Sequence, residues 1–182
     1  MSNDIQQQTT VNIQEKANLI WAIADKLVGV YKPHEYGNVI LPMCVIKRFE
    51  DTLTPTKQQV LDTNAKLDKD GIVVKKGFLE TAAGQQFYNL SPFTFQNLLN
   101  DPENIKDNFE SYLNHFSENV IDIIHRMDFD REIQKMADNN VLYLVIKEFC
   151  TPKAYLGADQ VTSVDMGYIF EELVRKFSES YD

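Results

Sequence analysis

Two apolar helical stripes joined by a short elbow constrain the fold of this chain more than any other feature. Apolar residues recur at every third or fourth position over residues 17–28, and again over residues 39–49. This spacing places each set on one face of an α-helix. We expect the two faces to close on each other as a helical hairpin at the centre of the hydrophobic core. The stripes comprise Ala17, Ile20, Trp21, Ala24, Leu27 and Val28 in the first segment, and Val39, Ile40, Met43, Ile46 and Phe49 in the second.

Glycine and proline limit these two helices. Gly29 is expected to end the first helix, because glycine tolerates the left-handed C-terminal conformation. Pro33 disfavours a helical backbone at Lys32, so the first helix cannot continue through the elbow. Pro42 lies inside the second apolar run, and we expect it either to kink that helix or to mark a late start.

The rest of the chain has the pattern of further helices. Helices are expected at residues 57–69, 93–100, 105–116, 117–127, a short stretch after 130, 141–149 and 167–178. Ser91, Asp101 and Asp165 are the expected N-caps of three of them. The only β-branched run, at residues 72–74, is too short for a sheet, so at most one short β-hairpin is expected near residues 72–88. We therefore predict an all-α domain with about eight to ten helices.

Composition predicts a folded protein without a membrane-spanning helix or a signal peptide. The 182 residues are 43% hydrophobic and 11% aromatic, which is enough for a folded core. No stretch approaches the roughly 20 continuous apolar residues of a membrane helix, and residues 1–10 lack the apolar region of a signal peptide. We expect a cytoplasmic protein without membrane contact. Cys44 and Cys150 are expected to be reduced thiols, with a disulfide as the alternative.

The net charge of −9 argues against a domain held to DNA by its overall charge, since non-specific affinity comes from neutralised phosphates. A local basic patch remains compatible with it. Basic and aromatic side chains gather around the elbow and the second helix, and the alternative interpretation is a solvated helix face paired with nearby carboxylates. The candidates for contacts with DNA are Lys32, His34, Tyr36, Lys47 and Arg48.

Motifs for catalysis, cofactor binding and metal binding are missing. The seven glycines form no G-x-G and no phosphate-binding loop. His34-Glu35 begins like the zinc motif H-E-x-x-H, but position 38 is Asn38. The sequence therefore predicts no catalytic, cofactor-binding or metal-binding residue.

Several short strings, in order along the chain, resemble the N-terminal helical domain of the modification (methyltransferase) subunits of type I restriction-modification systems. They include YKPHEYG at 31–37, VILP at 39–42, KRFED at 47–51, LYLVIKEF at 142–149 and MGYIFEELVRKF at 166–177. The residue pairs Asp101-Pro102 and Ser91-Pro92 match only part of the N/D/S-P-P-aromatic tetrad with which amino-group DNA methyltransferases hold their target amine. We interpret both as helix N-caps.

This resemblance implies a helical domain that helps to clamp double-stranded DNA and to assemble with the specificity subunit, without performing the chemistry. In this family the whole subunit is an adenine-specific DNA methyltransferase that transfers a methyl group from S-adenosyl-L-methionine to adenine N6. Its implied partners are the specificity subunit, a second modification subunit and the restriction subunit. The alternative is a helical protein–protein scaffold with no direct DNA contact.

The residue pattern and the resemblance together divide the chain. Residues 1–12 are expected to form a flexible N-terminal arm, residues 13–164 the helical domain, and residues 165–182 a helix leading toward a catalytic domain. The family continues past the position of Asp182, so we expect a fragment of a longer subunit. Residues 72–77 fit the family's pattern poorly, and their local fold is left open.

Overall fold

Helices account for all the regular structure in residues 2–179, the part of the chain that this computed structural model describes; for residues 2–11 only the backbone is described. The α-helices are α1 (Ser2–Ala22), α2 (Gly37–Leu53), α3 (Lys57–Lys69), α4 (Lys76–Ala83), α5 (Phe95–Leu98), α6 (Ile105–Asn114), α7 (Glu118–Arg126), α8 (Asp130–Asp138), α9 (Leu142–Phe149) and α10 (Ser163–Glu179). The 3-10 helices are η1 (Ile23–Leu27), η2 (Pro33–Glu35), η3 (Thr54–Thr56), η4 (Pro102–Asn104) and η5 (Pro152–Ala154). The all-α prediction is confirmed.

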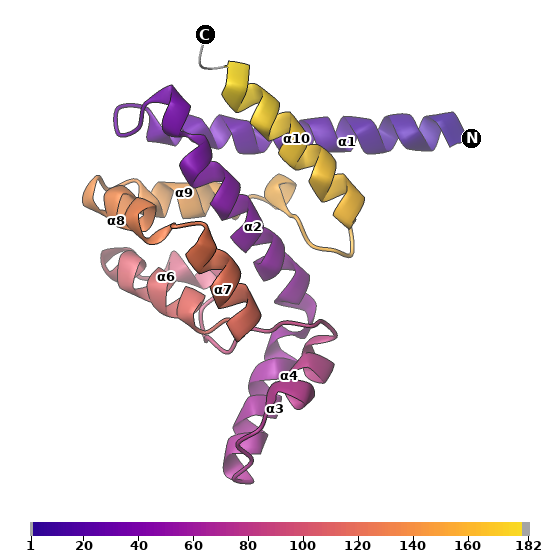
Figure 1. Cartoon of the computed structure of the whole chain (residues 1–182), viewed down its shortest axis with the longest axis vertical. Coiled ribbons are helices and arrows are strands. Elements are labelled where there is room, and N and C mark those ends of the chain that lie inside the picture. The colour runs from indigo at the N-terminus through magenta and orange to yellow at the C-terminus, as the bar shows by residue number, and fades with distance from the viewer. Residues whose placement is uncertain (1, 180–182) are drawn as a thin grey trace.

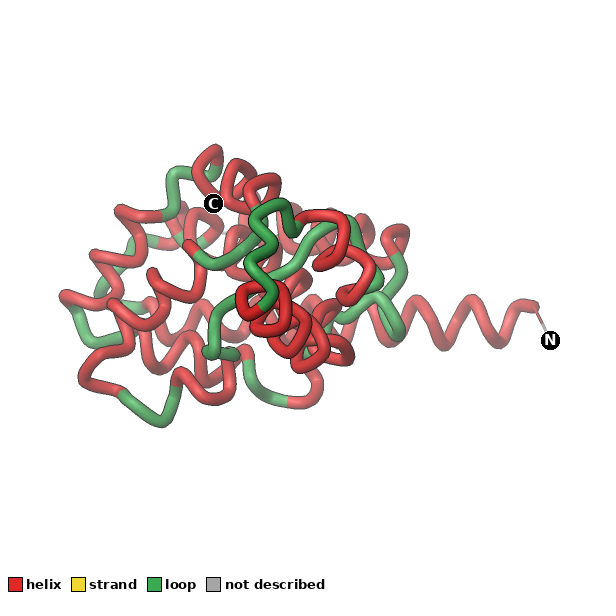
Figure 2. The backbone as a smooth tube through the Cα atoms, turned by 90° about the horizontal axis from the view of Figure 1, so that it is seen from below, coloured by secondary structure: helices red, strands yellow, loops and turns green. Residues whose placement is uncertain are grey.

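The helices surround α2, which crosses the middle of the molecule (Figure 1). The helices α6 to α9 lie together in one region, whereas α1 and α10 cross each other in another, and the pair α3–α4 projects as an arm beyond the end of α2. The N-terminal part of α1 extends past the body in the perpendicular view (Figure 2).

The first helix has a different partner from the one that the sequence suggested. Of the predicted core positions, Ala17, Ile20, Ala24 and Leu27 are buried and Trp21 is half-buried, but Val28 is 65% exposed, because it follows the last residue of η1. The helix α1 packs chiefly against α10 instead of forming a hairpin with α2. The ring centroids of Trp21 in α1 and Phe177 in α10 are 4.9 Å apart. A periodic stripe shows that a helix has a buried face, but it does not show which helix covers that face.

The second helix keeps its predicted stripe and passes through its proline. Val39, Ile40, Met43 and Ile46 are fully buried. The predicted late start is wrong, because α2 begins at Gly37 and Pro42 lies inside it. Pro42 sits near the N-terminal end, where its missing N–H removes a single intrahelical hydrogen bond.

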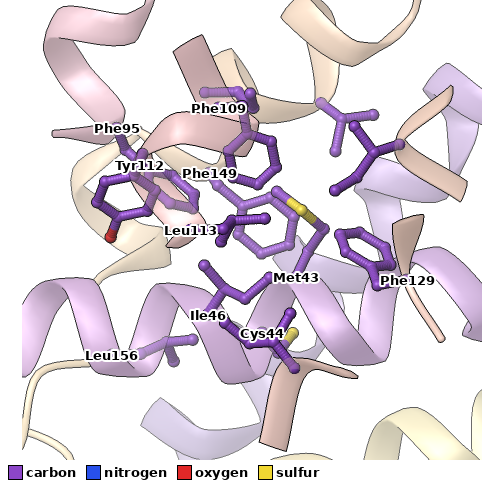
Figure 3. Close-up of a cluster of buried hydrophobic side chains, with 14 of the residues drawn as sticks. Met43, Cys44, Ile46, Phe95, Phe109, Tyr112, Leu113, Phe129, Phe149 and Leu156 are labelled. Carbon is purple, nitrogen blue, oxygen red and sulfur yellow. The ribbon is translucent and has the colours of Figure 1, made fainter. Parts of the chain in front are cut away.

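The core is one continuous hydrophobic cluster with a group of aromatic rings at one side (Figure 3). The rings of Phe95, Phe109, Tyr112 and Phe116 lie at centroid distances of 5.2 to 6.2 Å, mostly edge to face. Such edge-to-face pairs are favoured by the ring quadrupoles and add to the free energy of burial. The stripe predicted for residues 105–116 is therefore confirmed as core.

The α3–α4 arm contains a helix that the sequence did not reveal. Residues 72–75 connect the two helices without regular structure and α4 follows at Lys76, so no hairpin forms in the described chain near residues 72–88. The end of α3 is a Schellman motif: Gly71 has φ +71°, the Gly71 N–H donates to the Asp68 carbonyl at 3.1 Å, and the Ile72 N–H donates to the Leu67 carbonyl at 2.9 Å.

Two of the predicted N-caps, Ser91 and Asp165, do not cap the helices that the sequence assigned to them. Thr94, not Ser91, caps α5, through a capping box with Asn97. At α10 the capping box pairs Thr162 with Asp165, so Asp165 occupies the third helical position instead of the cap.

The predicted domain limits differ slightly from the observed elements. The backbone of residues 2–12 belongs to α1, and α10 begins at Ser163, two residues before the predicted limit at 165 and four before the predicted helix at 167–178. Residues 1 and 180–182 lie outside the described part of the chain. Whether the first residues are flexible stays a prediction.

Candidate functional site

The elbow between η1 and α2 brings three candidate DNA-contacting residues together. Lys32 and His34 are exposed, and Tyr36 is half-buried. The turn is closed by the Glu35 carboxylate, which accepts a hydrogen bond of 2.8 Å from the Lys32 N–H. That bond is the main reason why the pKa of Glu35 is lowered, with smaller contributions from the charges of Lys135 and His34. The elbow is therefore an ordered turn with cationic groups around one carboxylate.

Helix α8 adds a further cation to the elbow. The Lys135 ammonium lies 4.2 Å from the centroid of the Tyr31 ring, which is a cation–π contact. The Tyr31 hydroxyl donates to the Glu132 carbonyl at 3.3 Å, which fixes the elbow to α8. We call Lys32, His34, Tyr36 and Lys135 the elbow patch.

The other two candidates, Lys47 and Arg48, lie on α2 and have partners within the chain. Lys47 is 5% exposed and its ammonium is 2.5 Å from the Asp51 carboxylate. The Arg48 guanidinium is half-buried and donates to the carbonyls of Leu156, at 2.9 Å, and Val161. The structure thus separates these two residues from the elbow patch and gives both a role in holding the fold.

These contacts fasten residues 152–161, which we call the strap, to α2. The Asp51 carboxylate accepts from the Leu156 N–H at 2.9 Å, and the Thr52 hydroxyl accepts from the Ala158 N–H at 3.2 Å. From α1, the Lys16 ammonium donates to the Tyr155 carbonyl at 2.8 Å. Because the strap leads directly into α10, these hydrogen bonds set the position of that helix.

Glu50 of α2 contacts α5 and α6 instead of the strap. Its buried carboxylate accepts from the Phe95 N–H at 2.5 Å and from the Tyr112 hydroxyl at 2.9 Å. Burial raises the pKa of Glu50 despite these donors and the nearby Lys57. Lys57 donates to the Asn89 side chain at 2.9 Å, and burial lowers the pKa of Lys57 to about 8.

The side chains of the KRFED string of α2 thus contact several different neighbours. Phe49, between the charged residues, packs against Phe87 and Phe116 at centroid distances of 5.0 and 6.1 Å. The alternative of a solvated helix face is wrong for these residues, since Lys47, Glu50 and Asp51 are all buried, although Lys47 does pair with a nearby carboxylate, that of Asp51. Sequence periodicity missed them because it treats charged residues as exposed.

A cavity of about 560 Å³ adjoins this charged cluster. Burial raises the pKa of the Cys150 thiol, one of its lining groups, to about 11, so the thiol is protonated and a poor nucleophile at neutral pH. Both Cys150 and Cys44 are free thiols, as expected. The cavity is lined by Lys47, Glu50, Asp51, Thr54, Thr94, Phe95, Gln96, Cys150, Thr151, Pro152, Tyr155 and Gln160.

Metal-binding and membrane-spanning features are both missing from the described residues. There, no group of three or more His, Cys, Asp or Glu side chains is placed to hold a metal ion. In the same part of the chain, no helix combines the length and the apolar character needed to cross a bilayer.

Comparison with known families settles the relationship that these elements suggest. The family model described as the HsdM N-terminal domain matches residues 16–149, well over half of the chain. This chain belongs to that family. It is the N-terminal domain of a modification subunit of a type I restriction-modification system. No curated protein and no solved structure matches it significantly.

The match places the structural elements of this HsdM N-terminal domain in two groups. The elbow, α2 and the helices up to α9 lie within the matched residues, whereas the strap and α10 follow them. The side chains of KRFED that hold the strap therefore belong to the matched part. They connect the family's helical body to the segment that comes after it.

Proposed function

We propose that this domain helps to clamp DNA and to assemble the modification subunit with the specificity subunit. Methyl transfer, and the binding of S-adenosyl-L-methionine, would belong to another part of the subunit. The observation that carries this proposal is the match of the HsdM N-terminal domain family over residues 16–149. The proposed partners are double-stranded DNA, the specificity subunit, a second modification subunit and the restriction subunit.

The elbow patch is the surface that we propose for contact with DNA. It combines the exposed Lys32 and His34 with Lys135, all close enough to Glu35 to act on its pKa. Cationic side chains that neutralise phosphates supply most of the sequence-independent affinity for DNA. Specific base reading is left to the specificity subunit in this proposal.

Lys47 and Arg48 are poor positions for testing DNA contact, although the sequence suggests them. Lys47 is buried against Asp51, and Arg48 holds the strap. Replacing either residue would leave buried groups without partners and would change stability as well as any binding. The test therefore belongs at the elbow patch.

The experiment is a gel shift of the whole chain with the specificity subunit and a target duplex. The double variant Lys32→Ala/Lys135→Ala is expected to bind several-fold more weakly, with a salt dependence shallower by about one for each phosphate that is no longer neutralised. The control is Lys66→Ala/Arg126→Ala, which removes the same charge from exposed positions on α3 and α7. Equal behaviour of the two double variants would rule out the elbow patch as a DNA contact.

A scaffold that acts through protein contacts alone is the second candidate. Its supporting observations are the net charge of −9 and the engagement of Lys47 and Arg48 within the chain. In that case the specificity subunit would bind the chain equally well with and without duplex, and the elbow variant would change nothing. Calorimetry of the chain with S-adenosyl-L-methionine should give no binding heat under either proposal; a clear heat would place cofactor binding in this domain.

A further inference from the structure

One oxygen of the buried Asp51 carboxylate has no hydrogen-bond partner among the described residues. The Lys47 ammonium, at 2.5 Å, and the Leu156 N–H, at 2.9 Å, both donate to the other oxygen, Oδ2. No donor from the described chain reaches Oδ1. The Asp51 side chain is only 8% exposed, although a carboxylate offers about four acceptor positions. A buried carboxylate oxygen that the fold leaves free is available to a bound group.

This free oxygen borders the cavity of about 560 Å³ between α2, α5 and the strap. Within the described chain, every side-chain nitrogen or oxygen that is sealed from solvent has a hydrogen-bond partner. Oδ1 has none, so it is not sealed, and the cavity is the space that Asp51 lines. Small-molecule sites typically measure about 300–1,000 Å³. The oxygen therefore lies at the wall of a space that is large enough for a ligand.

The charge of the lining favours a cation over an anion. Lys47 contributes one ammonium, and Glu50 and Asp51 contribute two carboxyl groups, so the net charge is −1 when both are ionised and zero when Glu50 is protonated. The other described lining residues carry no charge. An anionic ligand would bring a second negative charge to Oδ1. A cation that carries N–H groups would instead form a charge-assisted hydrogen bond with Oδ1.

A planar organic cation suits this lining better than a metal ion does. No described group of three or more His, Cys, Asp or Glu side chains is placed to hold a metal. Phe95, Pro152 and Tyr155 supply apolar surface that a hydrated ion cannot use. An amidinium or guanidinium is weakly hydrated, presents N–H donors in a rigid plane and stacks on aromatic rings. Such a head on an apolar body would match both kinds of lining group.

We propose that this cavity binds a small molecule with an amidinium or guanidinium head and an apolar body. The head donates to Asp51 Oδ1 and to a remaining acceptor position of the Glu50 carboxyl, and the body lies against Phe95. A free small molecule is a better match than an arginine side chain of a partner protein, because one side chain would fill only part of the volume. The cavity lies at the opposite end of α2 from the elbow patch, and the proposal does not depend on the proposed function.

A titration of the whole ¹⁵N-labelled chain with benzamidine, followed by NMR, tests the proposal. The Phe95 and Leu156 N–H groups report on the site directly, because they donate to the Glu50 and Asp51 carboxylates. Their resonances should shift most, with a dissociation constant on the order of 1 mM for so small a ligand. Benzamide and benzoate share the ring and shape of benzamidine but have neutral and anionic heads. Benzamide should bind at least about tenfold more weakly, and benzoate should not bind.

A double variant tests the role of the free oxygen. Lys47→Met/Asp51→Leu removes it without leaving a lone buried charge. The matched control, Lys106→Met/Glu110→Leu, removes another i,i+4 pair, 3.5 Å apart on α6 and outside the cavity. The first variant should lose at least about tenfold in affinity for benzamidine and its preference over benzamide, whereas the control should bind like the original chain.

Three results would overturn the proposal. The first is the absence of shifts at Phe95 and Leu156 in the original chain at up to about 20 mM benzamidine, about twentyfold above the expected dissociation constant. The second is equal binding of benzamidine, benzamide and benzoate. The third is a folded Lys47→Met/Asp51→Leu variant that binds benzamidine as the control does. The first two results need no variant, so the proposal can fail even if the double variant does not fold.

Discussion

Lys47 and Asp51 form a buried ion pair whose two charges depend on each other. Both residues are nearly inaccessible, at 5% and 6% exposure, and Asp51 also accepts from the Leu156 N–H. Removing one member of such a pair leaves an uncompensated buried charge, whereas replacing both with apolar groups of similar size is often tolerated. The pair therefore stabilises this fold only as a unit.

We predict that Asp51→Ala lowers the free energy of unfolding by about 3–5 kcal/mol, because it leaves the Lys47 ammonium buried without its carboxylate. The double variant Lys47→Met/Asp51→Leu should recover most of that loss. Urea denaturation of both variants measures the difference. Arg175→Ala, which breaks only exposed pairs on α10, is the control and should behave like the original chain. A double variant as unstable as Asp51→Ala would contradict this account.

Glu50 should make stability depend on pH. Burial raises the folded-state pKa of Glu50 above its ordinary value of 4.5, with Tyr112, Lys57 and Asp51 as its charged or titratable neighbours. The native state therefore binds this proton more tightly than the unfolded state does. The contribution of Glu50 to stability is present below pH 4.5 and is lost as the pH rises through the folded-state pKa.

The variant Glu50→Gln isolates this effect, because its amide oxygen still accepts one hydrogen bond and carries no charge. We predict that the variant gains stability relative to the original chain as the pH rises from about 4.5, and that the difference levels off once Glu50 is ionised. Urea unfolding at a series of pH values from 4 to 8 measures it. A constant difference would show that folding does not shift the pKa of Glu50, and a change in the other direction would show that folding lowers it; either result would contradict the prediction.

At the scale of elements, α2 connects several parts of the molecule, because neighbouring side chains on it contact different partners. Arg48 and Asp51 bind the strap, Glu50 binds the first turn of α5, and Phe49 packs against Phe87. One helical turn thus fixes the strap, α5 and a loop. The arm is a separate element, whose direction depends on the turn at Gly71.

Two glycines of the arm give a matched prediction. A Cβ at Gly71 or at Gly77 would meet nothing within 4 Å, so only backbone conformation distinguishes them. Gly71→Ala should cost about 1 kcal/mol, because φ is +71° there. Gly77→Ala, within α4, should gain about 0.5–1 kcal/mol. Thermal or urea unfolding measures both, and changes of the same sign would contradict this description of the arm.

At the scale of the whole molecule, the strap and α10 should unfold together with the family's helical body. The strap is held by side chains of α1 and α2, and α10 packs on α1 through the contact between Phe177 and Trp21. Such long-range contacts couple the last helix to the first and favour a single cooperative transition. The chain contains only one tryptophan, so its fluorescence reports on the docking of α10.

We predict that the fluorescence of Trp21 and the far-UV circular dichroism give the same urea midpoint. Phe177→Leu should lower both midpoints equally, because it weakens packing without changing the cooperative unit. The experiment needs only the two signals measured on one sample. A fluorescence transition that precedes the loss of helical signal would show that α10 detaches on its own.

The candidate site could be predicted only in part. The sequence placed Lys32, His34 and Tyr36 together at the elbow because an X-Pro turn between two apolar stripes is visible in it, and their contact with DNA stays a prediction. Lys135 was missed, because it reaches the elbow from α8 and contacts Tyr31, about a hundred positions away. The helix α4 was also missed, since it is short and the preceding valines point to a strand.

The sequence by itself determined the helical class, most of the core positions of α1, η1 and α2, the elbow and the family. The helical class and the core positions depend on spacing within one or two turns, where 3.6 residues per turn fixes which side chains share a face. The family followed from the resemblance of short strings of residues. Tertiary structure alone decided that α1 packs on α10 and that Lys47, Glu50 and Asp51 are buried. Their partners, such as Phe95 and Leu156, lie 45 and 105 residues away. A charged residue becomes buried only where distant groups compensate it, and no local pattern in the sequence records that compensation.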